Sequence, residues 1–539
     1  MRFLVQHMLH DSACNRPHHE AFTEKDQKVL YGDASQTSKA IGECLRQLGI
    51  SRGDRIGVQL PPGINLPLSL MGIACADAVF VPIHHGLYPN QVAHILRDCG
   101  AIAFISDHER LTALEESHIP LENLRHCLIH DDGSSQADQI PTLPKTETHR
   151  IADLITASVG SFRESENIGK DLAAILYTSG STGAPKGVML SHDNLVAGAE
   201  IVADYLKIDK NERILAALPL SFDAGLNQLT TAILRGATTR MISFRFGREI
   251  VRSLADDAIT GLAGVPSLWN LLSRPSSGLG KQPLPSLRYI TNTGGAMPQN
   301  VLRDLRQQLP KTEVFLMYGL TEAFRSTYLP PDQLDQRPTS MGKPIPNTKI
   351  FVVNDHGQEC APDEVGELVH HGPTVSLGYW GHPELTDKVL RPHPFPNSGG
   401  SQSDRVCYSG DLVRRDNEGY LYFVGRRDNQ IKSSGFRISP TEVEDVITKM
   451  ENITQSAVIG VPDDVLGQHL VAFVIAAEGA GTDPEDVITH CAGMLPRHMI
   501  PKRVEIVTDL PSTSSGKVDY PALREHFAQS TPTSAECES

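Results

Sequence analysis

The chain has 539 residues, too many for one ordinary domain, so several domain-sized units are expected. Hydrophobic residues make up 40% and charged residues 21%, a globular balance with enough apolar material for a large core. The formal net charge of −15 argues against binding along a nucleic-acid backbone, which needs clustered lysine and arginine. Nucleic acid is therefore not an expected partner.

Cysteine usage and the lengths of the apolar runs bear on the cellular compartment. The nine cysteines are scattered and include no CxxC pair, which is typical of reduced thiols and not of a disulfide framework. The longest unbroken apolar stretches, such as 470–477, are strand-sized, so no membrane span is expected. The N-terminal apolar run is too short for a signal-peptide core and favours an amphipathic helix. We expect a soluble, cytoplasmic protein.

The first part of the chain alternates short β-branched runs with helical patterns. Strands are predicted at 55–60, 79–83 and 101–106, with helices at 66–76 and 90–99 between them. The same alternation returns further along, with strands at 237–243, 262–265, 287–291 and 313–317 and helices at 248–258 and 298–309. Such alternation predicts an α/β fold in which helices pack on parallel sheets.

After Pro338 the pattern changes. Strands are predicted at 349–354 and 367–371 and a hairpin over 412–424, without helices between them, which indicates a β-rich subdomain. A second compact pattern, small and α+β, starts at Gly425. Its helices are expected at 439–449 and 483–495, and its strands at 455–461, 469–476 and 503–507.

Three units follow from these patterns. We expect an N-terminal domain over 1–424, a small mobile C-terminal domain over 425–528, and a disordered tail over 529–539. The first helix of the C-terminal domain begins with Ser439-Pro440-Thr441-Glu442. This is the pattern of a capping box with proline at the first helical position.

One glycine- and hydroxyl-rich loop has the composition of a phosphate-binding site: Tyr177-Thr178-Ser179-Gly180-Ser181-Thr182-Gly183-Ala184-Pro185-Lys186-Gly187. Backbone N–H groups and short side chains can surround an anion there, and Lys186 adds positive charge. It is not a Walker loop, because Pro185 stands where the second glycine must precede the lysine. A strand-like run follows, and a helix begins only near Ser191, so the loop is expected to join two strands.

This loop resembles the signature loop of the acyl-adenylate-forming superfamily, which comprises acyl- and aryl-CoA ligases, amino-acid-adenylating enzymes and beetle luciferase. Further motifs follow in the order of that family and extend the resemblance over essentially the whole chain: Gly294-Gly295-Ala296, Tyr318-Gly319-Leu320-Thr321-Glu322, Gly366-Glu367-Leu368, Tyr408-Ser409-Gly410-Asp411-Leu412, Gly425-Arg426-Arg427-Asp428 and Gly516-Lys517. The resemblance implies an ATP-dependent, AMP-forming ligase that adenylates a carboxylic acid and passes the acyl group to a thiol. The N-terminal domain would then bind ATP and the acid.

Adenylation brings a carboxylate and the α-phosphate together, so a metal ion and a lysine are the natural neutralising groups. The resemblance implies that Glu322 holds Mg²⁺ and that Lys517 bridges the carboxylate and the α-phosphate. The two oxygens of Asp411 suit a ribose diol, and the resemblance implies that Arg426 reaches the same ribose. The catalytic residues are expected to be Lys517, Thr178 and Glu322. The full ATP and AMP site is expected to comprise Thr178, Ser179, Gly180, Ser181, Thr182, Gly183, Lys186, Gly294, Gly295, Ala296, Tyr318, Gly319, Thr321, Asp411 and Arg426.

The resemblance also implies a hinge. Asp428 lies where the C-terminal domain begins, and rotation there would withdraw Lys517 from the site. The same rotation would present the stretch from Lys432 to Gly435 to the thiol-bearing acceptor. One active site could then run two half-reactions.

The acyl pocket is the least determined part of the site. We expect Phe222, Asp223, Thr293 and Met317 to line it. Amino-acid-adenylating domains carry Phe-Asp at this place, where the aspartate receives the substrate ammonium, so Asp223 favours an amine-bearing acid. Those domains usually continue with a serine, and some fatty-acyl-AMP ligases have Asp followed by x-Gly-Leu, the pattern that Gly225 fits.

Arg325 leaves two interpretations open. It either faces the pocket, where it would prefer an acidic or polar group, or lies on the surface. The acid therefore stays open among fatty, aryl, dicarboxylic and amino acids.

The acceptor is also open. No Leu-Gly-Gly-x-Ser type of phosphopantetheine attachment site follows Lys517, so the acceptor is either CoA or a separate acyl or peptidyl carrier protein. The expected cofactors are ATP and Mg²⁺. Alternative functions are a stand-alone amino-acid-adenylating enzyme, a fatty-acyl-AMP ligase, a luciferase-like monooxygenase and a non-catalytic binding protein. The presence of Lys517, Glu322 and Asp411 weighs against the last of these.

Overall fold

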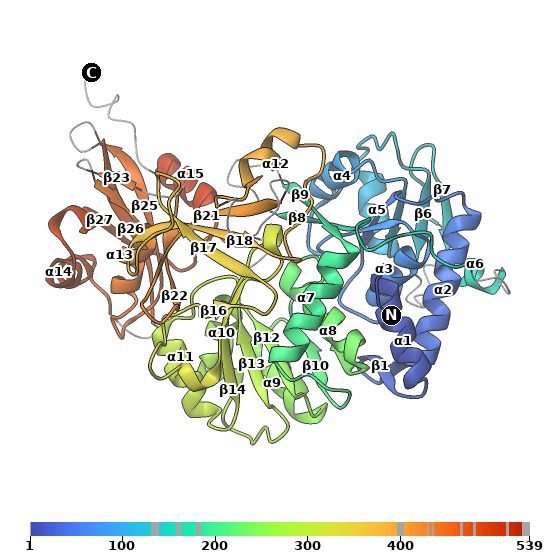
Figure 1. Ribbon diagram of the computed structural model, residues 1–539, viewed down its shortest axis with the longest axis horizontal. Helices are drawn as coiled ribbons and strands as arrows, with labels where there is room; N and C mark the ends of the chain where they lie inside the picture. The colour runs from blue at the N-terminus through green and yellow to red at the C-terminus, as the bar shows by residue number, and fades with distance from the viewer. Residues whose placement is uncertain are drawn as a thin grey trace.

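The computed structural model describes residues 2–130, 140–157, 163–178, 185–395, 404–427, 431–433, 436–463, 467–477, 481–513 and 517–530. Within these ranges, two large sheets form the body of the molecule (Figure 1). The eight-stranded sheet has the order β19-β9-β8-β4-β3-β5-β6-β7. Its strands are β3 (Arg55–Gln59), β4 (Val79–Pro82), β5 (Ala103–Ser106), β6 (His126–Ile129), β7 (Glu147–Arg150), β8 (Leu172–Thr178), β9 (Lys186–Ser191) and β19 (Gly378–Tyr379).

The nine-stranded sheet has the order β16-β15-β14-β13-β12-β10-β11-β1-β2. Its strands are β1 (Glu20–Glu24), β2 (Gln27–Leu30), β10 (Arg213–Ala216), β11 (Thr238–Met241), β12 (Gly261–Gly264), β13 (Tyr289–Asn292), β14 (Glu313–Tyr318), β15 (Thr327–Leu329) and β16 (Lys343–Pro344). The central strands of both sheets are parallel, as the alternating pattern predicted, and the edge strand β7 also pairs parallel. Strands β2, β15 and β16 of one sheet and β9 and β19 of the other pair antiparallel. The predicted α/β fold class is confirmed.

Helices cover both sheets, and most of them present one apolar face to a sheet. The helices over 65–75 and 223–235 are instead buried along nearly all of their residues. They are α1 (Val5–Asn15), α2 (Tyr31–Gln47), α3 (Asn65–Cys75), α4 (Pro89–Asp98), α5 (His108–Glu116), α6 (Ile151–Ala157), α7 (His192–Tyr205), α8 (Asp223–Arg235), α9 (Gly247–Asp256), α10 (Pro266–Ser273) and α11 (Gln299–Gln308). One cluster of buried apolar side chains joins the two sheets through α1, α3, α7 and α8. The loops on either side of α8 are therefore held between two rigid layers.

A smaller antiparallel sheet follows, with β17 (Lys349–Val353), β18 (Val365–His371), β20 (Leu390–Pro392), β21 (Arg405–Arg415) and β22 (Leu421–Arg426). The expectation that no helix interrupts this region is wrong, because α12 (Pro383–Val389) lies between β19 and β20. Pro383 occupies the first turn of that short helix, where its missing N–H costs nothing.

The C-terminal elements are β23 (Ile431–Ser433), β24 (Phe436–Ile438), α13 (Pro440–Ile447), β25 (Ile453–Asp463), β26 (Gly467–Ala476), α14 (Pro484–Met494), β27 (Arg503–Ile506) and α15 (Tyr520–Ser530). In Figure 1 they lie at one side of the molecule, in orange to red. Helix α15 extends two residues into the stretch that was expected to be a disordered tail; 531–539 lie outside the described residues.

The predicted capping box does not form. Helix α13 does begin at Pro440, but the Ser439 side chain makes no capping hydrogen bond. Its hydroxyl instead donates to the Val424 carbonyl oxygen at 2.6 Å. This tertiary hydrogen bond replaces the helix cap and connects the start of α13 to β22.

No helix among the described residues combines the length and apolar character that a membrane span requires. No disulfide joins the eight cysteines in the described part of the chain.

Candidate active site

The predicted nucleotide residues gather where β13 and β14 end. The Gly294–Ala296 loop comes directly after β13, Tyr318 is the last residue of β14, and Thr321 and Glu322 lie in the short 3₁₀ helix η2 (Thr321–Ala323) that follows. Because these two strands are parallel, their carboxyl ends meet at one edge of the sheet. Ligands usually bind at that edge of an α/β sheet.

Strand register brings the buried Asp411 carboxylate into an ion pair with the partly exposed Arg426 side chain. They stand opposite each other on the antiparallel strands β21 and β22. The Asp411 Oδ1 and Arg426 Nη1 atoms are 2.9 Å apart, and the Tyr318 hydroxyl donates to Asp411 Oδ2. Burial raises the pKa of Asp411, while the charges of Arg426 and Lys517 and the Tyr318 hydrogen bond oppose that rise. The carboxylate is thus held by two residues that the motifs identified.

Lys517 reaches the same site from the C-terminal loop. A Cβ atom placed on Gly294 would lie 3.6 Å from Lys517 Cε. The loop is closed by two contacts between Thr513 and Lys517: the Thr513 N–H donates to the Lys517 carbonyl at 2.8 Å, and the Lys517 N–H donates to the Thr513 hydroxyl at 3.3 Å. Lys517, Gly294 and Asp411 therefore lie together, although they are far apart in the sequence.

Glu322 is held in place by a residue that the sequence motifs did not identify. The Tyr379 hydroxyl, on β19, donates to Glu322 Oε1 at 2.5 Å, and the Ser376 N–H donates to the Glu322 carbonyl oxygen at 2.9 Å. Among the described residues Oε2 has no hydrogen-bond partner. The sequence signal for Tyr379 was weak: an aromatic pair after a glycine in a turn-rich stretch.

The turn after Glu322 is conformationally strained. Phe324 has a φ of +21°, which side chains rarely adopt, and it is fully buried. It packs against Gly198 on α7, where an added Cβ would lie 2.5 Å from Phe324 Cδ1. This packing fixes the turn that carries Glu322 on one side and Arg325 on the other.

Arg325 is 4% exposed, so its surface interpretation is wrong. Its Nη1 lies 3.8 Å from Asp223 Oδ2 and donates to Thr293 Oγ1 at 3.4 Å. Its Nε is buried and has no hydrogen-bond partner among the described residues. Two of the predicted pocket residues, Asp223 and Thr293, therefore meet around a buried guanidinium that is incompletely bonded.

Phe222 and Met317 are the other two predicted pocket residues. Phe222 caps the N-terminus of α8, and its ring stacks on His84 with centroids 6.0 Å apart. Burial lowers the pKa of His84 to about 4, so its imidazole is neutral at physiological pH. Met317 on β14 accepts a hydrogen bond from the Tyr205 hydroxyl at 3.5 Å. His84 and Tyr205 were not predicted, because neither belongs to a motif.

Gly225 has a packing role. A Cβ at this position would lie 1.8 Å from the Pro219 carbonyl oxygen, closer than any real contact. A serine here would require the 218–221 segment to move. The close approach of α8 to the 218–221 segment therefore accounts for glycine at position 225.

Several predicted residues cannot be placed. Ser179, Gly180, Ser181, Thr182 and Gly183 of the phosphate loop lie outside the described residues, as do the hinge residue Asp428 and Gly435. Lys432 lies on β23, but its side chain is not described. The ends of the phosphate loop are described: Thr178 and Lys186 pair across the antiparallel strands β8 and β9. The loop joins two strands, as predicted.

Comparison with known proteins agrees with this arrangement. Residues 9–380 match the AMP-binding enzyme family and residues 442–517 match the AMP-binding enzyme C-terminal domain. A long-chain-fatty-acid–CoA ligase of Salmonella typhimurium is 30% identical, covering 94% of this chain and 91% of its own. A linear gramicidin synthase from Brevibacillus parabrevis is 28% identical, covering 95% of this chain and 10% of its own.

The fold also matches solved structures. The crystal structure of ATP-bound MatB from Rhodopseudomonas palustris superposes with a TM-score of 0.84 at 25% identity, covering 98% of this chain and 99% of that chain. The family match extends over more than half of the chain, and the motif residues Tyr318, Asp411, Arg426 and Lys517 lie close together. The chain belongs to the AMP-binding enzyme family and is an ATP-dependent, AMP-forming ligase that activates a carboxylic acid as its adenylate.

Proposed function

We propose that this ligase activates a carboxylic acid that carries a second hydrogen-bond acceptor, and that it transfers the acyl group to CoA. The observation that supports the acid is the buried Arg325 guanidinium between Asp223 and Thr293, with its Nε lacking a partner among the described residues. Buried polar atoms are nearly always hydrogen-bonded in a working complex. The missing partner is then a group that the acid brings with it.

In the adenylation step, Lys517 neutralises the charge that develops between the acid carboxylate and the α-phosphate. Its side chain lies beside Gly294 and acts electrostatically on Asp411, which positions it over the nucleotide side of the site. Asp411 and Arg426 hold the ribose, because a carboxylate accepts from both hydroxyls and a guanidinium donates. A preorganised cation contributes most where charge is gained in the transition state.

Glu322 fits a Mg²⁺ ligand by its bonding pattern. One carboxylate oxygen accepts from Tyr379 and the other has no partner among the described residues. Mg²⁺ commonly binds through one carboxylate plus substrate phosphates. When bound, the ion would supply charge neutralisation at the phosphates of ATP.

Asp223 supports a second candidate, an amino acid. Phe222-Asp223 resembles the pair that receives a substrate ammonium, and a gramicidin synthase is among the relatives at 28% identity. Against it stands Arg325, which already faces the Asp223 carboxylate at 3.8 Å. A substrate ammonium would have to share that carboxylate with a guanidinium, at a cost in like-charge repulsion.

CoA is favoured as the acceptor because the relative of comparable length is a CoA ligase. The match covers 91% of the fatty-acid–CoA ligase but only 10% of the gramicidin synthase. We assign the thiol-transfer step to the unit over 425–528, which would move about Asp428 against the unit over 1–424. A cytoplasmic location follows from the need for ATP and CoA.

The test is a pyrophosphate-release screen with matched pairs of acids. The first two pairs differ only in a second acceptor group, hexanoic against adipic acid and benzoic against 2-hydroxybenzoic acid. The third pair, propanoic acid against alanine, differs only in an ammonium group. We expect higher kcat/KM for the member with an acceptor oxygen. Preference for alanine would instead support the amino-acid candidate, and equal rates across every pair would contradict the role of Arg325. Mass spectrometry of the product with CoA and with a carrier protein then identifies the acceptor.

A further inference from the structure

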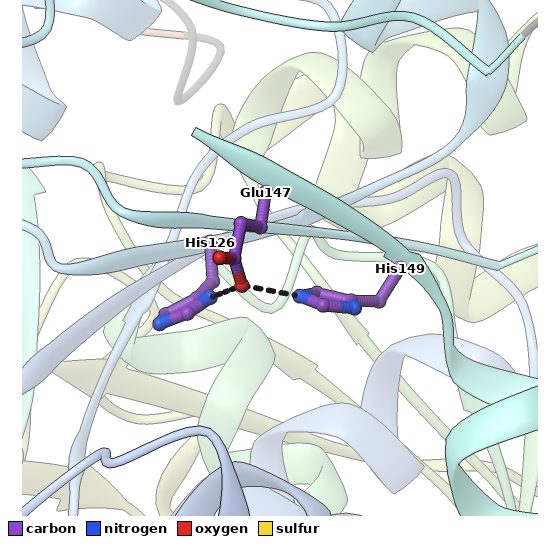
Figure 2. A group of neighbouring side chains, drawn as sticks. All are labelled: His126, Glu147 and His149. Atoms are coloured by element: carbon purple, nitrogen blue, oxygen red, sulfur yellow. Dashed lines mark ion pairs between the residues drawn. The ribbon is translucent and has the colours of Figure 1, made fainter. Parts of the chain in front are cut away.

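Three potential metal ligands stand together on neighbouring strands, away from the site described above. His126 is the first residue of β6 and Glu147 the first of β7, and the two are paired in the parallel register. His149 follows Glu147 by two residues and therefore points to the same face of β7. Figure 2 shows the two imidazoles on either side of the Glu147 carboxylate, with both contacts made to one oxygen.

The location separates this cluster from adenylation. Strands β3 to β8 of the eight-stranded sheet run parallel, so strand starts lie at one edge and strand ends at the other. Thr178, at the carboxyl end of β8, leads into the phosphate loop. His126 and Glu147 start their strands and lie at the opposite edge.

The geometry does not suit direct hydrogen bonds. Glu147 Oε2 is 3.8 Å from His126 Nδ1 and 3.7 Å from His149 Nε2, which is too long for either. Both nitrogens are buried, and within the described ranges neither has a hydrogen-bond partner. Two imidazole nitrogens are thus aimed at one carboxylate oxygen without bonding to it.

We propose that His126, Glu147 and His149 bind one Zn²⁺-class transition-metal ion through Nδ1, Oε2 and Nε2. The three ligand atoms lie within 4.8 Å of one another. Tetrahedral Zn²⁺ with bonds of about 2.0–2.1 Å needs ligand atoms about 3.4 Å apart. The two separations from Glu147 Oε2, 3.7 and 3.8 Å, would have to close by a few tenths of an ångström, and the two imidazole nitrogens, which lie within 4.8 Å of each other, would also have to approach. A water would complete the fourth position.

The ion's class follows from the donor set. Two imidazoles and one carboxylate suit Zn²⁺, Co²⁺ or Ni²⁺, whereas Mg²⁺ prefers oxygen ligands alone. Because β7 is the edge strand of its sheet, the ion would clamp that strand to β6. The bound ion would stabilise the β6–β7 edge of the sheet, and adenylation would not require it.

Zn²⁺ titration of EDTA-treated full-length protein by calorimetry tests the proposal, with Co²⁺ absorbance as a second readout. The wild type is expected to bind one ion saturably, to give the intense visible bands of tetrahedral Co²⁺, and to resist a 100-fold excess of Mg²⁺. His149→Ala and Glu147→Gln are expected to weaken binding by at least ~10-fold, the usual minimum for losing support of a site. His356→Gln, at an exposed histidine on the turn after β17, is the matched control and keeps wild-type affinity.

Folding is checked by thermal unfolding in EDTA. Zn²⁺ is expected to raise the Tm of the wild type and of His356→Gln but not of His149→Ala. Glu147 is 73% exposed, so Glu147→Gln tests the ligand set with little loss of packing. The proposal is overturned if the wild type binds no Zn²⁺ saturably, or if Glu147→Gln and His149→Ala bind it as tightly as His356→Gln. Mg²⁺-dependent adenylation by His149→Ala should equal that of the wild type.

Discussion

The proposed nucleotide-binding side and the proposed acid-binding side of this active site differ in how closely their charged side chains are paired. On the nucleotide side, Asp411 meets Arg426 at 2.9 Å and also accepts from the Tyr318 hydroxyl. On the acid side, Arg325 stands 3.8 Å from Asp223, and its Nε has no partner among the described residues. The nucleotide is the same in every turnover, so the protein can preorganise every contact to it. On the acid side, we propose that the substrate supplies the partner that Arg325 Nε lacks, a contact that no sequence motif specifies.

The largest effect is expected from removing Lys517, the cation that we propose lies between the acid carboxylate and the α-phosphate. Lys517→Ala should lower the adenylation rate by roughly 10²–10³, or about 3–4 kcal/mol, because a preorganised charge is lost from the transition state. Pyrophosphate release with saturating ATP and acid measures this loss. Transfer of a pre-made acyl adenylate to the thiol should be much less affected.

Lys502→Ala is the matched control, since that lysine is also near the C-terminus but pairs with Asp463 at 2.9 Å. A near-normal adenylation rate in Lys517→Ala would remove Lys517 from the mechanism. A similar loss in both variants would point to general damage of the C-terminal region.

Arg325→Leu is expected to come next and to act on the acid side alone. It should lower kcat/KM for an acceptor-bearing acid by about 10–10²-fold, in line with ~1.5–3 kcal/mol for a hydrogen bond to a charged group. The KM for ATP should stay unchanged. The decisive control is the acid of the same pair that lacks the second acceptor. If the variant loses activity equally with both acids, Arg325 supports the fold and does not select the substrate.

Tyr379→Phe probes how Glu322 is held on the nucleotide side. Losing the hydroxyl bond should raise the Mg²⁺ concentration needed for half-maximal activity by up to about 10-fold, equivalent to ~1.5 kcal/mol. Saturating Mg²⁺ should restore most of the rate, and excess EDTA should abolish it. A fall in kcat that Mg²⁺ does not rescue would contradict this role.

Asp223→Asn should have the smallest effect if the acid brings an acceptor. We then expect kcat/KM to change by no more than about fivefold, within ~1 kcal/mol, because Thr293 still contacts the guanidinium. If the acid carries an ammonium, the same variant should lose orders of magnitude with amine-bearing acids only. The ratio of kcat/KM between the two proteins separates the two candidates.

The fold was largely predictable where central strands are buried on both faces and helices on one. Apolar runs such as 79–83 and periodic stretches such as 90–99 therefore match β4 and α4 closely. Short edge elements were missed: β19 has two residues, and its pairing with β9 connects positions nearly two hundred residues apart. No local pattern reports such a contact.

The site was predictable where function demands fixed residue types in one order. Asp411, Arg426, Tyr318 and Lys517 belong to motifs, and the structure brings them together. Tyr379 and the burial of Arg325 depend on tertiary packing, as does the Ser439 hydroxyl, which bonds Val424 in place of capping its helix. A local sequence pattern does not predict the hydrogen bond of a side chain when its partner is distant in the sequence.

The Asp223–Arg325 pair has a consequence for how this enzyme's substrate range can evolve. Changing Arg325 alone leaves the Asp223 carboxylate without its neighbouring guanidinium in a largely buried place, at a cost to stability and activity. Only a coordinated change of both escapes that cost, because the effects of contacting residues are not additive. Single-step drift toward a new acid therefore passes through a less fit intermediate. Laboratory evolution of this pocket should mutate 223 and 325 in one library.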